Sequence, residues 1–218
     1  MEVHPSAFNG SNAQAHFDVR KDQVTARKAA KAHFVNHALG LVSVEVMDRV
    51  LQVIYDYWAS RLGTLLLYGA FAIHYSLALW ALWQRRSLRM PAADATQLVL
   101  GFCIPFLLTE HVLQTRVADT FYGADYGYYA PLLYTFFVLS PWRGALQLTV
   151  LVVAWVHAML GFRFWLRLKP WYPRWQPLLF AFALLLPTFA ILGFFEGGRE
   201  VMDSVHWMGP YPASSRRS

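Results

Sequence analysis

The sequence has a single cysteine and few charged residues. Cys103 has no second cysteine to pair with, so an intramolecular disulfide is excluded, and no set of cysteines exists to hold an iron–sulfur cluster. Only 15% of the 218 residues are charged, whereas 56% are hydrophobic and 17% are aromatic. This balance excludes an ordinary soluble domain. Residues 1–24 are polar and lack the apolar core of a signal peptide, and we predict a disordered arm there.

Long uncharged stretches predict membrane-spanning helices, because a helix needs roughly 20 apolar residues to cross a bilayer core. The predicted fold is all-α, a polytopic transmembrane helix bundle at 25–201 followed by a tail at 202–218. The four clear spans are predicted at about 62–84, 95–116, 143–166 and 177–195. A first helix at about 30–47 is short and flanked by charges, so it is either a truncated span or an interfacial amphipathic helix. A short outer helix is expected at 128–140.

Basic residues gather in two of the predicted loops. The connections at 84–94 and 163–176 are rich in Lys and Arg, whereas the opposite loops carry Asp and Glu. The positive-inside rule therefore places both connections, and with them the N-terminus, in the cytoplasm. Clusters of Trp and Tyr at the two predicted boundaries are typical of membrane interfaces. The net charge of +6 is thus explained by topology in a lipid bilayer, and a nucleic-acid partner is not needed.

Each of three predicted spans contains one histidine, namely His74, His111 and His157, and the first helix contains His37. An ionisable residue at membrane depth indicates a functional site, and neutral imidazole is a common axial ligand of haem iron. With a rise of about 1.5 Å per residue, His74 and His157 fall at one depth, nearer the inner boundary. His111 and His37 share a level near the outer boundary. We therefore predict two haem sites, an inner one on His74 and His157 and an outer one on His111 and His37.

Two residues beside these histidines are further candidates. His33 lies four residues before His37 on the same helix face, so either could bind the iron; His37 lies deeper and is preferred. Glu110, beside His111, is the only acid inside a predicted span. It could handle protons near a quinone, orient a ligand imidazole as carboxylates do around metals, or be an interfacial carboxylate in contact with water.

The surroundings of the inner histidines leave two interpretations open. Small residues such as Gly63 and Ala70 precede His74, and Gly161 follows His157 by one turn. They would let a flat porphyrin lie against the backbone, or they would simply let two helices approach closely. Three basic residues pose a similar choice, since they could pair with haem propionates or merely follow the topology rule. These residues are Arg85, Arg86 and Arg163.

Several blocks of the sequence resemble one kind of membrane anchor. The blocks are "NHALGLVS" at 36–43, "HYSLALWALWQRRSLRMP" at 74–91, "TQLVLGFCIPFLLTEHVLQTRVA" at 96–118, "FVLSPWRGALQ" at 137–147, "WVHAMLGFRFWLRLKPWY" at 155–172 and "GREV" at 198–201. Together they resemble the N-terminal six-helix anchor of bacterial class III adenylate/guanylate cyclases. That anchor is similar to the diheme cytochrome b subunit of succinate–quinone oxidoreductases. The resemblance covers about residues 32–201 and departs at Arg163, where such anchors carry another histidine.

The resemblance implies two haem b groups on four histidines, electron exchange with membrane quinone, and redox control of a cytoplasmic cyclase. The implied ligands are His37, His74, His111 and His157. It also implies a bacterial inner (cytoplasmic) membrane location. The chain as given carries no iron–sulfur or cyclase segment, so we expect a non-catalytic anchor that is a fragment or a relative of a cyclase. Its expected partners are those missing segments or a second copy in a homodimer.

Two other functions fit the same sequence. The chain could be the cytochrome b electron-transfer subunit of a quinone oxidoreductase, partnered by a separate flavoprotein as in succinate dehydrogenase. It could also be a structural or transport bundle without haem, in which the histidines only form hydrogen bonds between helices.

Overall fold

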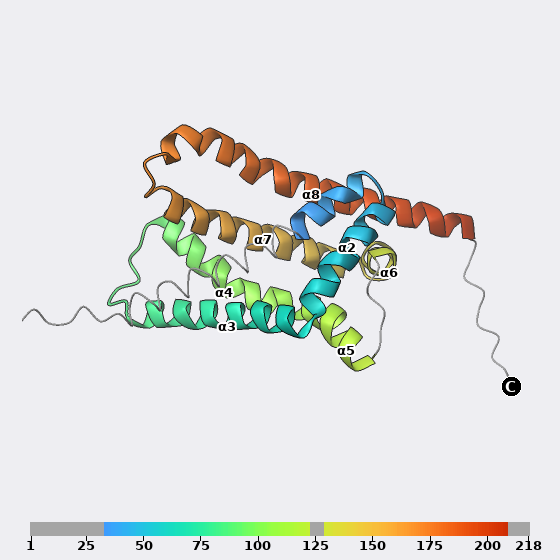
Figure 1. The fold of residues 1–218 in the computed structure, drawn as a ribbon, viewed down its shortest axis with the longest axis horizontal. Coiled ribbons are helices and arrows are strands. Elements are labelled where there is room, and N and C mark those ends of the chain that lie inside the picture. Colours follow the sequence, from blue (N-terminus) through green and yellow to red (C-terminus); the bar gives the residue numbers. More distant parts are fainter. Residues whose placement is uncertain (1–32, 123–128, 209–218) are drawn as a thin grey trace, which may run out of the picture. The chain divides into compact units, whose positions relative to one another are not determined.

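The structure is a computed structural model that describes residues 33–122 and 129–208, and throughout these ranges the regular elements are helices. The predicted all-α class is therefore confirmed. After a helical segment at 33–38, the elements in chain order (Figure 1) are η1 (Leu39–Leu41), α2 (Val44–Ala59), α3 (Arg61–Trp83), α4 (Ala92–Val112), η2 (Leu113–Val117), α5 (Ala118–Tyr122), α6 (Tyr129–Tyr134), η3 (Thr135–Leu139), α7 (Pro141–Leu166) and α8 (Tyr172–Met208). The chain forms two compact units; α3 belongs to the first, and helices α4 to α8 with residues 33–55 belong to the second. The predicted disordered arm at 1–24 lies outside the described residues, as does most of the predicted tail.

Four of these helices are long and apolar enough to cross a membrane. They are α3, α4 continued by η2, α7 and α8, and they coincide with the four predicted spans. Large hydrophobic side chains on them are exposed: Leu65 is 71% exposed, Trp83 85%, Phe106 76% and Phe180 63%. Contiguous apolar surface of this kind is unusual on a soluble protein but is the normal outer surface of helices in lipid. The chain is therefore a membrane protein whose helices contact the bilayer.

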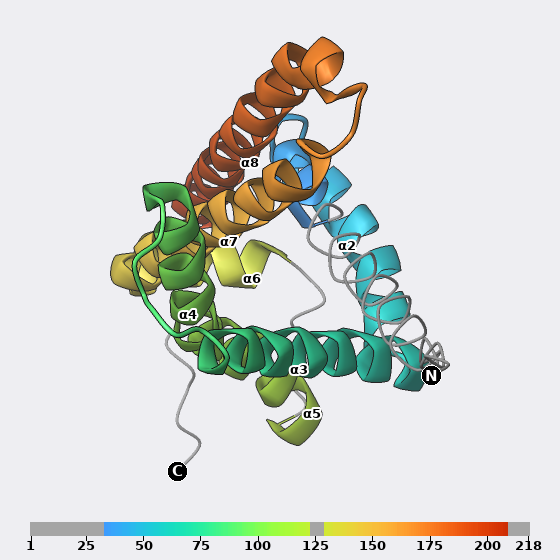
Figure 2. The same ribbon diagram turned by 90° about the vertical axis from the view of Figure 1, so that its left-hand side faces the viewer.

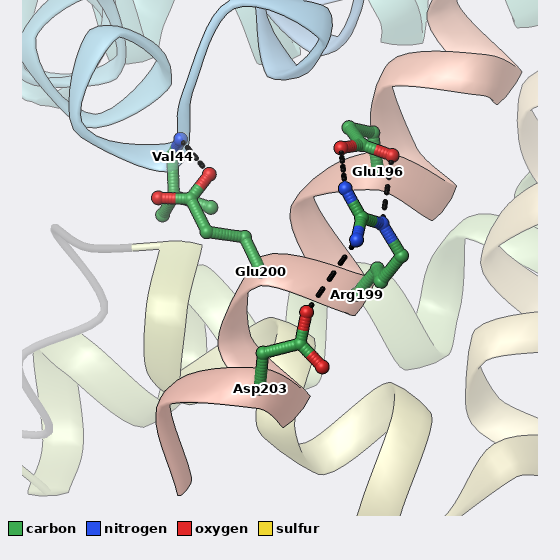
Figure 3. A network of polar contacts seen from close by, with 5 residues as sticks. All are labelled: Val44, Glu196, Arg199, Glu200 and Asp203. Carbon is green, nitrogen blue, oxygen red and sulfur yellow. Dashed lines mark hydrogen bonds and ion pairs between the residues drawn. The ribbon is translucent and has the colours of Figure 1, made fainter. Parts of the chain in front are cut away.

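The segment predicted as one helix at 30–47 is divided by a turn. The helix at 33–38 passes into the 3-10 turn η1, and α2 begins afresh at Val44. Two side chains cap this new start: Ser43 Oγ accepts a hydrogen bond from the Val46 amide at 3.2 Å, and Glu200 on α8 accepts one from the Val44 amide at 2.9 Å (Figure 3). Such caps satisfy the free N–H groups that open a helix. The sequence prediction missed α2 as a separate helix because charged residues recur along it, so no apolar run of span length marks it.

Helix α8 is longer than the predicted span at 177–195, since it continues to Met208. Beyond the apolar run, Arg199 forms ion pairs with Glu196 at 2.5 Å and with Asp203 at 3.5 Å (Figure 3). Pairs three and four residues apart on a helix stabilise it modestly, and these pairs support the polar end of α8.

The segment 33–41 crosses α8 (Figures 1 and 2), and two glycines meet at the crossing. A Cβ on Gly40 would overlap the backbone oxygen of Gly193, and a Cβ on Gly193 would overlap the backbone oxygen of His37. Only glycine permits this approach, because a close helix crossing needs a missing side chain at the contact. The crossing fixes His37 against α8.

A tryptophan compensates for a proline inside α8. Pro187 has no N–H, so it cannot donate the helical hydrogen bond to the carbonyl of Ala183, four residues earlier. Trp155 on α7 donates its indole N–H to that carbonyl at 2.7 Å, and its ring is 4% exposed in a cluster with Phe34 and Leu151. The indole therefore satisfies a backbone group that lipid could not.

We expect Trp155→Phe to lower the free energy of unfolding in detergent by about 1–3 kcal/mol, because the Ala183 carbonyl then loses its donor. In a Pro187→Ala background the helix supplies the missing N–H, so the same substitution should cost clearly less. Denaturant titration of the single and double variants measures this coupling. An equal cost in both backgrounds would contradict the role of the indole.

Candidate functional site

Helices α4 and α7 lie side by side and antiparallel (Figure 1). Polar contacts join them at both ends of the pair. At one end, His111 Nδ1 lies 3.0 Å from Gln147 Oε1. Beside it, Arg143 Nε lies 3.4 Å from Glu110 Oε1, and Gln114 donates to the same Glu110 oxygen. Since the amide oxygen of Gln147 accepts, Nδ1 carries the proton of His111 and Nε2 carries the lone pair. That is the nitrogen a metal would take.

At the other end of the pair, His157 Nδ1 lies 3.0 Å from the backbone oxygen of Gln97. A carbonyl can only accept, so here too Nδ1 holds the proton and Nε2 the lone pair. The imidazole packs against Gly101, where an added Cβ would lie 2.8 Å from His157 Cε1. Pro105 lies four residues after Gly101 and leaves the Gly101 carbonyl without its helical donor. Beside this ring, the α4 backbone therefore lacks a side chain at Gly101 and a helical hydrogen bond to the Gly101 carbonyl.

The two imidazoles lie at different levels of the α4–α7 pair. His157 lies beside Gly101, ten residues before His111 on α4, which corresponds to about 15 Å along a helix. Each has its Nδ1 proton fixed by an oxygen acceptor. The pair therefore offers two separate imidazole ligands, one near each end.

Two further histidines approach His111 from the segment 33–38. His33 and His37 are hydrogen-bonded through their Nε2 atoms at 3.2 Å, and the ring centre of His33 lies 5.8 Å from that of His111. His37 is 9% exposed, and its ring centre lies 5.4 Å from that of Tyr129 and 6.0 Å from that of Phe194. The structure thus brings together three of the predicted site residues, and Glu110 is the neighbour of one of them.

A buried polar chain lies behind His37. Asn36 is fully buried and donates to the Tyr129 hydroxyl at 3.0 Å, and the Tyr129 amide donates to Asp48 at 2.6 Å. Two buried atoms in this region, Asn36 Oδ1 and His37 Nδ1, have no hydrogen-bond partner in the described part of the chain. Uncompensated buried polar atoms are uncommon and mark a place where a further group could bind.

Burial favours the neutral form of His33 and His37. The segment 33–38 lies outside the four candidate spans. Burial lowers the pKa of His37 to about 4, with His111 adding to the shift. Burial, followed by the nearby His37 and His111, lowers the pKa of His33 as well. Neutral imidazole is the form that ligates metals, so the donor set fits a metal-centred cofactor without further deprotonation.

The remaining predicted residues are distributed as follows. His74 lies on α3 in the first unit, with an exposed side chain. The predicted pairing of His74 with His157 stays a prediction, because the two residues belong to different units. Arg85 and Arg86 follow the end of α3, and Arg163 lies near the end of α7; all three side chains are exposed. Their pairing with propionates also stays a prediction.

Two of the small residues noted in the sequence are accounted for by packing. A Cβ on Gly63 would overlap the Tyr57 carbonyl, so this glycine serves the turn before α3. A Cβ on Gly161 would lie 3.2 Å from the Gln97 side chain. Sequence reasoning missed Gln97 and Gln147, which orient the two histidines. The available signal was that both are amides inside apolar spans, where a polar group needs a partner.

Within 33–122 and 129–208, no group of three or more His, Cys, Asp or Glu side chains could hold a bare metal ion. A haem needs only two axial imidazoles, which is a different arrangement. Comparison with protein-family models, with curated proteins and with solved structures found no match to this chain.

Proposed function

We propose that this membrane protein is a haem-b-binding redox anchor that responds to membrane quinone. The observation that carries the proposal is the convergence of His33, His37 and His111, together with the fixed Nδ1 protons of His111 and His157. Histidines whose second nitrogen is held by an oxygen acceptor are typical of metal ligation. A plain interhelical hydrogen bond would not require three imidazoles at one place.

Two haem sites are proposed. The inner site joins His74 and His157, and the outer site joins His111 to a histidine of segment 33–38, which the sequence predicts to be His37. When bound, haem iron accepts and returns one electron. The chain's own residues orient the imidazoles through Gln97 and Gln147. Glu110, which is ion-paired with Arg143, lies beside the outer site, where its carboxylate would exchange a proton with quinone.

The proposed setting is the bacterial cytoplasmic membrane, with the N-terminus and the Arg-rich connections 84–94 and 163–176 inside. A change of charge at the haems would shift the helices between two arrangements and pass the redox state to a cytoplasmic cyclase. A coding sequence that continues into iron–sulfur and cyclase segments would favour this role. A neighbouring flavoprotein gene would favour an electron-transfer subunit of a quinone oxidoreductase.

The test is an absorption spectrum of the protein purified in detergent, before and after dithionite. We expect sharp α and β bands on reduction, as bis-histidine b-type haem gives, and a pyridine haemochrome titration should give two haems per polypeptide. One haem would indicate that only one of the two sites forms. Absence of the bands from protein expressed with sufficient haem would refute both redox functions and leave the bundle without haem.

A further inference from the structure

The outer site contains two histidines four residues apart, and the structure distinguishes them. Two imidazoles on opposite sides of one metal, each with its nitrogen about 2 Å from it, have ring centres roughly 6 Å apart. His33 and His111 have ring centres 5.8 Å apart, with planes inclined by 71°. The separation of these two ring centres therefore matches that of two imidazoles on one metal.

His37 lies in a different environment. Its Nε2 is bonded to His33, and its ring is enclosed by Tyr129 on α6 and Phe194 on α8. Its backbone is held against Gly193 at the glycine crossing, so the residue has little freedom to move toward α4. His33, on the same helix face, is half-buried. His37 is therefore enclosed by α6 and α8, whereas the ring centre of His33 lies 5.8 Å from that of His111.

We propose that His33, and not His37, is the axial ligand opposite His111, and that His37 is a positioning residue that holds the His33 imidazole. This inference rests on the proposed haem function. A His33 imidazole whose Nε2–H donates to His37 keeps its lone pair on Nδ1, which neutral histidine can also use to bind a metal. The His37 bond then plays the part of the oxygen acceptors at His111 and His157, fixing the ring and its proton.

Matched substitutions by Met and by Ala at the two positions test the assignment in the full chain. Methionine can replace histidine as a haem ligand and raises the reduction potential. We expect His33→Ala to lower the haem content from two to one per polypeptide, and His33→Met to retain two haems with a raised midpoint potential of one. We expect His37→Gln, which keeps a hydrogen-bond acceptor, to retain two haems. His37→Met should also retain them, with an altered low-spin electron paramagnetic resonance signal but no Met-ligated haem.

The opposite pattern would overturn the assignment: loss of a haem in His37→Gln, or a raised potential in His37→Met, while the His33 variants resemble the wild type. Two unaltered haems in every variant would overturn it too. Elution of each variant as the wild-type species in detergent controls for folding, and the Met variants report ligation even where the Ala variants fail to fold. Failure of the proposed function is distinguishable, because it is read from the wild type alone as an absence of haem bands.

Discussion

Replacing His157 by Ala should lower the haem content of the purified protein from two to one per polypeptide. The imidazole is oriented by the Gln97 carbonyl at 3.0 Å and packs against Gly101. Its loss removes both a proposed haem ligand and the side chain that fills the space beside Gly101. A five-coordinate iron is held weakly, and we expect the inner haem to dissociate during purification. His74→Ala should produce the same loss, because the two residues are proposed to share one iron. A pyridine haemochrome titration measures the result.

Two further variants sharpen this experiment. Thr149→Ala changes a side chain on the same helix that bonds its own helix backbone at Ala145, so it should retain both haems. Gly101→Ala leaves every ligand in place but puts a Cβ 2.8 Å from His157 Cε1, so it should shift the potential or spectrum of the inner haem. Full haem content in both His74→Ala and His157→Ala would show that the inner pairing is wrong.

The four spans were predictable because membrane crossing imposes a simple length and composition rule. The rule makes no reference to packing, and the spans of α3, α4, α7 and α8 follow it. It fails for α2, whose position depends on the Ser43 and Glu200 caps, and the second of these comes from 156 residues along the chain. It also fails for the end of α8, which continues beyond the apolar run into a segment that carries ion pairs. These features arise from specific partners and not from average hydrophobicity.

The candidate site was predictable in the same partial sense. Counting residues along each helix predicts that His37 and His111 share one level, and the structure brings His33, His37 and His111 together. Depth favours His37 over His33, but residues four apart share a face and differ by only one helical turn, so depth alone does not decide which of them meets His111. That choice depends on how the segment 33–38 is rotated against its neighbours, and the glycines that fix this rotation carry no chemical signal of their own. The orienting partners Gln97 and Gln147 were missed for the same reason, since a helix's rotation decides which amide meets which imidazole.

Replacing Gly193 by Val should be the most damaging single change in the second unit. The Cβ would overlap the backbone oxygen of His37, and backbone atoms in two crossing helices cannot move aside as a flexible side chain can. We expect the free energy of unfolding in detergent to fall by about 3 kcal/mol or more, at or beyond the upper end of ordinary overpacking. Because the crossing holds the segment 33–41 against α8, the outer haem should be lost as well, leaving one haem per polypeptide.

Gly69→Val on α3 is the matched control, because nothing lies within 4 Å of a Cβ built at that glycine. Valine is a better helix former than glycine, so this variant should unfold at the same or slightly higher denaturant concentration and keep both haems. Gly193→Ala should fall between the two, since its single methyl already meets the His37 backbone. A Gly193→Val protein as stable as Gly69→Val would mean that the backbones are further apart than the structure places them. The outer ligand would then have to be held by contacts other than this crossing, because the segment that carries His33 and His37 would no longer depend on α8 for its position.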